Sequence, residues 1–399
     1  MAEIEDTVKI PEDTGDKLLP SELQNQQSDD MAPYFALLSE EKPPSPPPTP
    51  IIIGLDRSLV LSSLCFPELT VDGLSYAPAK LICNKKSLNN IDELKKFVFL
   101  RHINIAFNDL TDLTALYGLR HLLLLDASHN LLKEFPVGNW PYLTHLLLSN
   151  NRISELTEIS FPNLKVLSLN NNHIRTLVKP NTGEPFFHGA AFPELHTLEL
   201  AHNKLSRGNG RDEDEINNPS PIRLQLPKLK ALFLGQNALK SFAIYRLVPK
   251  VTSSDTFDEL AVGEEMLEEA TVTKMVLARD EEESALGELP QLSVLHLRSN
   301  KLRDAYGLTE KAVPALEYLN MRDNRVRSAD YLDRLSLLTN LRTLILLDNP
   351  VCEMKDYRLE MRVNIQSLRR LDKETYTKEE NQEADLMAEQ RRVERSAAS

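Results

Sequence analysis

The sequence predicts an α/β solenoid in which short parallel strands stack into one sheet, and two observations lead to that prediction. The segment FPNLKVLSLNNNHI (Phe161–Ile174) recurs in eight further copies along the 399 residues. The first copies follow one another at steps of 22, 21 and 21 residues. One such unit cannot bury its own apolar side chains, so the units are stable only when they stack on their neighbours.

The repeated template is Leu-x-x-Leu-x-Leu-x-x-Asn-x-(Leu/Ile), which is the leucine-rich repeat. In Phe161–Ile174 it is filled by Leu164, Leu167, Leu169, Asn172 and Ile174. The short period predicts a parallel sheet on the concave side and 3₁₀ or short helices on the convex side. The asparagine is expected to satisfy backbone groups at the bend after each strand. This structural ladder comprises Asn108, Asn130, Asn151, Asn172, Asn203, Asn237, Asn300, Asn324 and Asn349.

The N-terminal part divides into a tail and a cap. Residues 1–55 are acidic and proline-rich, a composition that predicts disorder. Residues 56–99 are expected to form the N-terminal cap with a degenerate repeat at Lys80–Leu94, in which Lys86 stands where asparagine belongs. A defective first turn is typical of a cap, because one of its sides faces water.

The fuller repeats occupy residues 100–349 and contain three insertions, at 179–190, 207–220 and 249–286. Insertions in a solenoid form loops. The third one combines helix-forming composition with many acidic residues, and two interpretations remain open for it: a projecting helix or helical hairpin, or a disordered acidic loop.

The C-terminal part is expected to close the solenoid. Residues 350–376 form the predicted C-terminal cap, and residues 377–399 a charged helix opened by a capping box of Thr377 and Glu380. The side chains expected to cover the last turn are Leu359, Val363, Ile365, Leu368 and Leu371.

Charge is distributed unevenly. The formal net charge of the chain is −13, with −8 in residues 1–50 and −10 in residues 251–290, so the rest carries +5. The three cysteines have no metal-ligand spacing and are interpreted as reduced thiols. The N-terminus has no secretory signal pattern and no stretch approaches the roughly 18 apolar residues of a membrane span, so we expect a cytosolic location or one continuous with it.

The side chains free to carry function are those at the third, fifth and seventh template positions, which line the concave face. In the first five repeats they are mostly small and neutral, whereas from Phe233 onward they become aromatic, cationic and apolar, the mixture enriched in protein interfaces. The competing interpretation is an ordinary surface. The predicted partner-binding residues are Phe233, His296, Arg298, Tyr318, Arg322, Ile345 and Leu347.

Catalysis finds no support in the sequence. There is no metal-ligand spacing, no glycine-rich phosphate loop and no nucleophile with a base and an acid, so we expect no enzyme activity, no cofactor and no small-molecule substrate. Arg298 and Arg322 are too few to follow a phosphate backbone, so we expect no nucleic acid. No membrane partner is expected either.

The C-terminal third narrows these expectations. Four segments resemble the axonemal leucine-rich repeat-containing protein twenty-three family: LPKLKALFLGQNALK, LSVLHLRSNKL, ALEYLNMRDNRV and above all LRTLILLDNPVCEMKDYRLEMRVNIQSLRRLDKETYTKEENQEAD. The resemblance covers roughly Leu81–Glu394, and its specific part is the cap. It implies a non-enzymatic scaffold of radial spokes in motile cilia and flagella, with other spoke proteins as partners. The acidic insertion and the two shorter loops are departures from the family pattern.

Two other families share short repeats of this kind. The leucine-rich regulatory partner of protein phosphatase one has a similar cap, which keeps a phosphatase regulatory subunit as the alternative function. The leucine-rich spliceosomal subunit is a third possibility, although that family is shorter and has fewer repeats.

Overall fold

The computed structural model describes residues 52–70, 73–207, 220–249 and 275–398. Nearly all of the predicted tail 1–55 therefore lies outside the described residues, as do most of the insertion 207–220 and the central part of 249–286. Residues 52–399 form one compact unit.

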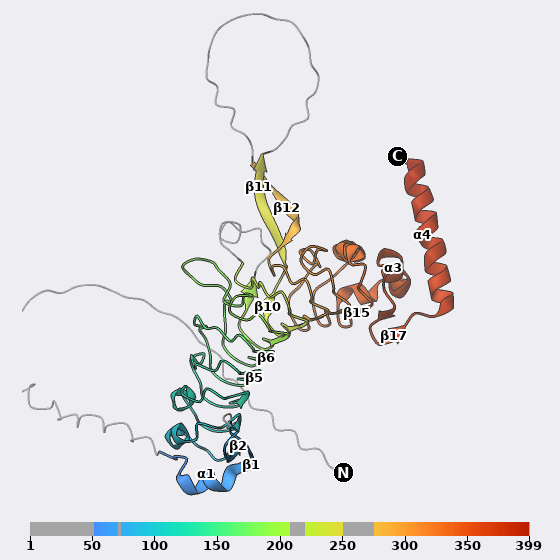
Figure 1. Cartoon of the computed structure of the whole chain (residues 1–399). Helices are drawn as coiled ribbons and strands as arrows, with labels where there is room; N and C mark the ends of the chain where they lie inside the picture. The colour runs from blue at the N-terminus through green and yellow to red at the C-terminus, as the bar shows by residue number, and fades with distance from the viewer. Residues whose placement is uncertain (1–51, 71–72, 208–219, 250–274, 399) are drawn as a thin grey trace, which may run out of the picture. The chain divides into compact units, whose positions relative to one another are not determined.

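The described residues form a main sheet of 13 strands that follow one another almost in chain order (Figure 1). The strands are β1 (Leu64–Leu69), β2 (Tyr76–Ile82), β3 (His102–Asn104), β4 (Leu124–Asp126), β5 (His145–Leu147), β6 (Val166–Ser168), β7 (Thr197–Glu199), β9 (Ala231–Phe233), β13 (Val294–His296), β14 (Tyr318–Asn320), β15 (Thr343–Ile345), β16 (Arg370–Leu371) and β17 (Glu374–Thr375). Pairing is parallel from β2 to β16 and antiparallel at both ends. The α/β solenoid with a parallel sheet is thereby confirmed.

The register of the sheet follows from the template. In each repeat strand the central leucine or isoleucine is buried and lies opposite its counterpart, as with Leu295 between Leu232 and Leu319. The template leucines at Leu164, Leu167 and Leu169 are fully buried. Because strand side chains alternate, the residues on either side of the central one face away from this core. We call that outward face of the sheet the concave face.

The opposite side of the core carries short helical turns and connecting loops. Those of 3₁₀ type are η1 (Asp92–Lys96), η2 (Thr114–Leu116), η3 (Ala329–Leu337) and η4 (Pro350–Glu353). The insertion 179–190 is tied down there, because Phe187 is buried and packs against Phe192, which in turn contacts Phe161.

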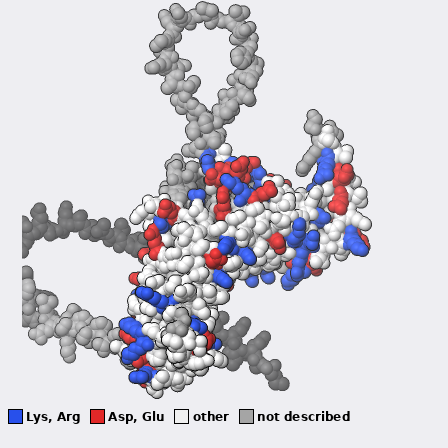
Figure 2. Space-filling view, in the orientation of Figure 1, with Lys and Arg blue, Asp and Glu red and all other residues white. Residues whose placement is uncertain are grey.

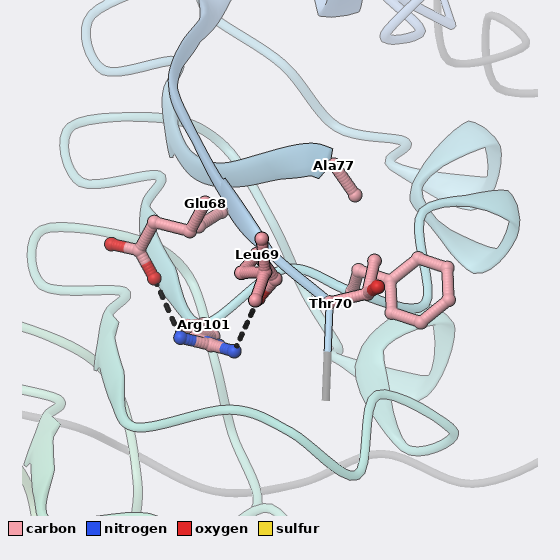
Figure 3. Close-up of a pocket in the computed structure, with 7 residues that line it drawn as sticks. Glu68, Leu69, Thr70, Ala77 and Arg101 are labelled. Atoms are coloured by element: carbon pink, nitrogen blue, oxygen red, sulfur yellow. Dashed lines mark hydrogen bonds and ion pairs between the residues drawn. The ribbon is translucent and has the colours of Figure 1, made fainter. Parts of the chain in front are cut away.

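The N-terminal end is capped by helix α1 (Arg57–Ser63) and the antiparallel β1–β2 hairpin. The end of β2, from Lys80 to Ile82, is the strand of the degenerate repeat and pairs with β3. Arg101 fastens this hairpin: its guanidinium donates to Glu68 at 2.7 Å and to the Leu69 carbonyl at 3.0 Å (Figure 3). The hollow beside it has essentially no volume open to a water molecule, so it is a packed joint.

The C-terminal end is capped by helix α3 (Tyr357–Asn364), the β16–β17 hairpin and helix α4 (Lys378–Ala398). Ile365, Leu368 and Leu371 are buried as expected, but Leu359 and Val363 are only partly buried. Met361 takes the fully buried position on α3, because the helical register places its side chain, and not theirs, on the solenoid. Both bonds of the predicted capping box are present: Thr377 N donates to Glu380 at 2.8 Å, and Glu380 N to Thr377 Oγ1 at 3.1 Å.

The third insertion differs from both sequence interpretations in its described part. Strands β11 (Ala243–Pro249) and β12 (Met275–Ser284) pair antiparallel and form a two-stranded ribbon that stands off the solenoid (Figure 1). A helix over Met275–Ser284 is therefore wrong, and the insertion begins at Ala243, before Pro249. Cross-strand pairs such as Tyr245 with Arg279 favour the ribbon over a helix or a disordered loop. The amino-acid composition of the insertion does not reveal such pairs. A smaller parallel pair joins β8 (Ser206–Arg207) to β10 (Ala238–Leu239).

Candidate functional site

The seven predicted partner-binding residues lie on four adjacent strands or directly after them. Phe233, His296 and Ile345 end β9, β13 and β15, and Tyr318 begins β14. Arg298, Arg322 and Leu347 occupy the seventh template position, where the chain leaves the sheet. The pairing of β9 with β13, β14 and β15 in turn brings these residues, which span more than a hundred positions of sequence, onto one surface.

Three of the predicted residues form an aromatic column. The rings of Phe233 and His296 are stacked with centroids 4.6 Å apart, and the rings of His296 and Tyr318 lie 5.0 Å apart with a tilt of 39°. The Asn320 amide approaches His296 Nδ1 at 3.5 Å. Burial between these neighbours lowers the pKa of His296, which favours the neutral imidazole in the column.

The two arginines beside the column are not equivalent. Arg322 Nε donates to Asp348 at 2.6 Å, so its charge is already balanced. Arg298 is exposed, and among the described residues its guanidinium makes no hydrogen bond or ion pair. Arg298 is therefore the cation of this surface that is free to meet a partner.

The concave face ends just beyond Ile345 and Leu347, both of which are partly buried. Asp372 closes the last rung, because its Oδ1 accepts from the backbone N–H groups of Leu346 at 2.8 Å and Leu347 at 3.1 Å. Tyr357 donates to the other carboxylate oxygen of Asp372 at 3.2 Å. The apolar pair thus stands at the edge of the cap, next to the aromatic column.

The N-terminal half of the concave face is polar and satisfied from within. Glu199 accepts from Ser168 Oγ and from Asn170 Nδ2, both at 2.6 Å, and Ser168 also bonds Ser149 at 2.6 Å. Asn104 bonds Asp126 at 3.2 Å. Groups already paired with each other gain less from a partner, so the C-terminal half is the better candidate surface.

Each asparagine of the ladder joins two repeats. Asn172 Nδ2 donates to the carbonyls of Leu148 at 3.0 Å and Leu169 at 3.1 Å, and its Oδ1 accepts from Ile153 N at 3.0 Å. The same pattern recurs at the other rungs, for example at Asn324 and Asn349.

Sequence reasoning missed one row of mostly exposed side chains, which occupy the eighth template position, directly before each asparagine. In every repeat this residue has positive φ without being glycine; examples are Phe107, His129 and Asp348. Phe107 and His129 stack there at 4.0 Å, with Lys85 5.2 Å from the Phe107 ring. The signal available in the sequence was a large or polar residue at this place in every repeat.

Metal-ligating groups and surface hollows are the features of the described residues that bear on catalysis. No group of three or more His, Cys, Asp or Glu side chains among them could hold a metal ion. A hollow of about 460 Å³ lies beside Lys179 and His188, and another of about 290 Å³ lies between η3 and α4. Among the described residues, none of the helices has the length and apolar composition that crossing a membrane requires.

Comparison with known proteins gives the family. Residues 278–398 match the family model described as leucine-rich repeat, and residues 141–183 match the one described as leucine-rich repeats in two copies. Among solved structures, the leucine-rich repeat domain of APL1B covers 75% of the chain and 74% of its own length, at 15% identity and a TM-score of 0.42.

Curated relatives are more similar. The chain is 33% identical to leucine-rich repeat-containing protein 23 of Bos taurus over 336 residues, which cover 82% of this chain and 76% of that protein. It is 30% identical to the Homo sapiens protein of the same name over 348 residues, which cover 87% and 82%. Leucine-rich repeat proteins are in general modules for protein interaction, and the chain is such a scaffold. With repeats, cap and relatives in agreement, this chain belongs to the leucine-rich repeat-containing protein 23 family.

Proposed function

We propose that this protein is a non-enzymatic structural scaffold of the ciliary or flagellar axoneme, a radial spoke component that binds other spoke proteins through its concave face and insertions. Family membership supports the scaffold, and the resemblance noted in the sequence supplies the axonemal setting. The proposed location is therefore the cytoskeleton of a motile cilium or flagellum.

The observation that carries the proposal is the Phe233–His296–Tyr318 column beside the unpaired Arg298. Aromatic and arginine side chains dominate the energetics of protein interfaces, because they remove large apolar areas from water while keeping a polar contact. A half-buried column of this kind next to a free cation fits an apolar partner surface with an acidic rim.

Binding through this surface is tested with full-length protein and purified axonemal extract. Arg298→Glu and Tyr318→Ala are expected each to weaken capture of spoke proteins, because they remove a charge contact and an aromatic contact. Lys165→Glu, at an exposed lysine directly before β6, is the matched control and should bind as the unaltered protein does. Equal capture by all variants with unchanged melting would rule out this surface.

Localisation tests the setting. A tagged full-length chain in motile ciliated cells should remain with isolated axonemes after detergent extraction, and a diffuse signal absent from axonemes would sink the axonemal proposal. Recovery of a phosphatase catalytic subunit as the main partner would favour the regulatory-subunit alternative instead.

A further inference from the structure

A row of basic side chains runs along the flank of the solenoid, beyond the asparagine ladder and away from the concave face. It arises at the tenth and twelfth template positions, the first and third residues after each asparagine. We call its C-terminal part the basic ridge, which comprises Lys240, Lys301, Arg303, Arg325 and Arg327. Arg152, Arg175 and Lys204 continue the same positions in earlier repeats.

The ridge points outward because of its alternation with the core. The eleventh residue is buried, as Leu302 and Val326 show, while the residues before and after these two are exposed. Lys240, after the buried Leu239, is partly exposed. In an extended segment neighbours point to opposite sides, so the tenth and twelfth side chains share the solvent face.

Backbone hydrogen bonds hold adjacent rungs of the ridge together. Lys301 N donates to the Leu239 carbonyl at 2.8 Å, Arg325 N to the Leu302 carbonyl at 2.8 Å, and Arg303 N to the Lys240 carbonyl at 3.3 Å. Hydrogen-bonded extended segments lie about 4.8 Å apart, and alternate residues about 7 Å apart along the chain. Five cations therefore share a patch in which each is within a Debye length of about 8 Å from another.

These charges lack counterions of their own. Among the described residues, none of the five ridge side chains makes an ion pair, and Asp304, the neighbour of Arg303, accepts from Ser241 Oγ at 2.8 Å. The acidic base of the β11–β12 ribbon is likewise paired, through Arg246 with Asp280 and Glu283. Figure 2 shows acidic side chains gathered at that base.

We propose that the basic ridge is a second docking surface, which binds an extended acidic segment of a partner protein. An extended acidic chain presents alternate carboxylates about 7 Å apart, which matches the separation of the tenth and twelfth positions. This surface is distinct from the concave face and does not depend on the axonemal assignment.

Single-stranded nucleic acid fits the ridge less well. Sites for it combine cations with aromatic side chains on which bases stack, and the five ridge residues include none. Arg152, Arg175 and Lys204 extend the charge, and His173 is the one ring at the tenth and twelfth positions of these earlier repeats.

The test measures binding of a labelled peptide of alternating Glu and Ser to the full-length protein by fluorescence anisotropy. The double variant Arg303→Glu/Arg327→Glu should bind at least about tenfold more weakly, since two lost ion pairs of about 0.7 kcal/mol each make that factor. If this charge reversal lowers the melting temperature, the milder double variant Lys301→Ala/Arg325→Ala is used for the binding measurement instead. Binding should also weaken as salt is raised.

The matched control is Lys165→Glu/Lys230→Glu, which makes the same change in charge. These exposed lysines occupy the second template position, directly before β6 and β9. The control should bind the peptide normally, and so should Arg298→Glu on the concave face. Equal loss in the control would overturn the proposal in favour of nonspecific attraction. Tighter binding of an unstructured RNA oligonucleotide, lost in the ridge variant, would replace the acidic protein with nucleic acid.

Discussion

Asparagine at the ninth template position shows how a single side chain can join two repeats. Asn324 is buried, its Nδ2 donates to the carbonyls of Leu297 and Met321 at 2.9 Å each, and its Oδ1 accepts from Leu302 N at 3.0 Å. The carbonyls of Leu297 and Met321 also accept from Asn300 at 3.0 Å and Asn349 at 2.8 Å, so the Leu302 N–H is the backbone group that depends most on Asn324.

We expect Asn324→Ala to lower the free energy of unfolding by about 1–3 kcal/mol, because the buried Leu302 N–H loses its acceptor. Urea unfolding followed by circular dichroism measures the change. Arg325→Ala, at the exposed neighbouring position, is the control and should unfold almost as the unaltered protein does. A stable Asn324→Ala variant would mean that the bend satisfies its backbone groups in another way.

His296 gives the concave face a dependence on pH. Burial lowers its pKa below the ordinary 6.5, so the folded state disfavours the protonated ring more than the unfolded state does. The stabilising effect of the neutral ring is complete above the unfolded pKa and is lost as pH falls below about 6.5 toward the folded pKa.

As pH is lowered through that range, the free energy of unfolding should therefore fall more steeply for the unaltered protein than for His296→Gln. The glutamine side chain does not titrate there. His173→Gln, which removes an exposed ring, should keep the steep dependence. Identical pH profiles for the unaltered protein and His296→Gln would contradict the assignment.

At the scale of elements, the β11–β12 ribbon is held by contacts from the segment between β13 and β14. Thr309 Oγ1 donates to the Glu282 carbonyl at 3.0 Å, and the Arg279 guanidinium lies 3.7 Å from the centre of the Tyr306 ring. Gly307 stands beside the base of the ribbon with φ +85°, and a Cβ there would collide with the Phe242 carbonyl oxygen. Only glycine fits that approach.

Gly307→Ala is expected to destabilise the fold by more than about 1 kcal/mol, because both the backbone conformation and the contact with Phe242 oppose a side chain. Thermal unfolding measures this loss. Gly118→Ala is the matched control, since no atom lies within 4 Å of its added carbon. Equal stability of the two variants would show that the loop around Gly307 relaxes freely.

Helix α4 packs on the cap although its sequence has no continuous apolar stripe. Ala384 is buried, and the helix is held to α3 mainly through charges: Arg358 with Glu380 at 2.9 Å, and Glu360 with Arg391 at 2.6 Å. Leu386 and Val393 remain exposed. The apolar periodicity of its sequence predicts a solvated helix, because ion pairs between charged side chains do not contribute to apolar periodicity.

For the whole molecule, the direct pairing of β9 with β13 means that the sheet does not need the ribbon between them. A solenoid is stabilised by contacts between neighbouring rungs, and those rungs are already neighbours. The ribbon is an addition to a continuous core.

Replacing residues 247–278 by a short Gly/Ser linker should therefore leave the far-UV circular dichroism of the solenoid and its cooperative melting nearly unchanged. The Ala243–Arg246 base and the contacts from Arg279 onward are kept in this design. Loss of cooperative melting would show that the ribbon is part of the folding unit. Loss of partner capture alone would instead assign it a binding role.

The sequence by itself determined the stacking. Leucines at fixed spacing require a shared core, the asparagine requires a bend, and the period determines which residues face outward, so the sheet, the ladder residues and the column from Phe233 to Tyr318 could be placed in advance. These features are local or repeat from rung to rung, and a pattern in one repeat is evidence for all the others.

Only the tertiary structure decided what depends on unique contacts. For the third insertion the sequence left a helix and a disordered loop open, and in its described part β11 and β12 pair with each other instead. On α3, packing chose a helical register that buries Met361 in place of Leu359 and Val363. The tertiary structure also separated Arg322, balanced by Asp348, from the free Arg298. Such pairings join residues that no period relates, so their energies become visible only once the chain has folded.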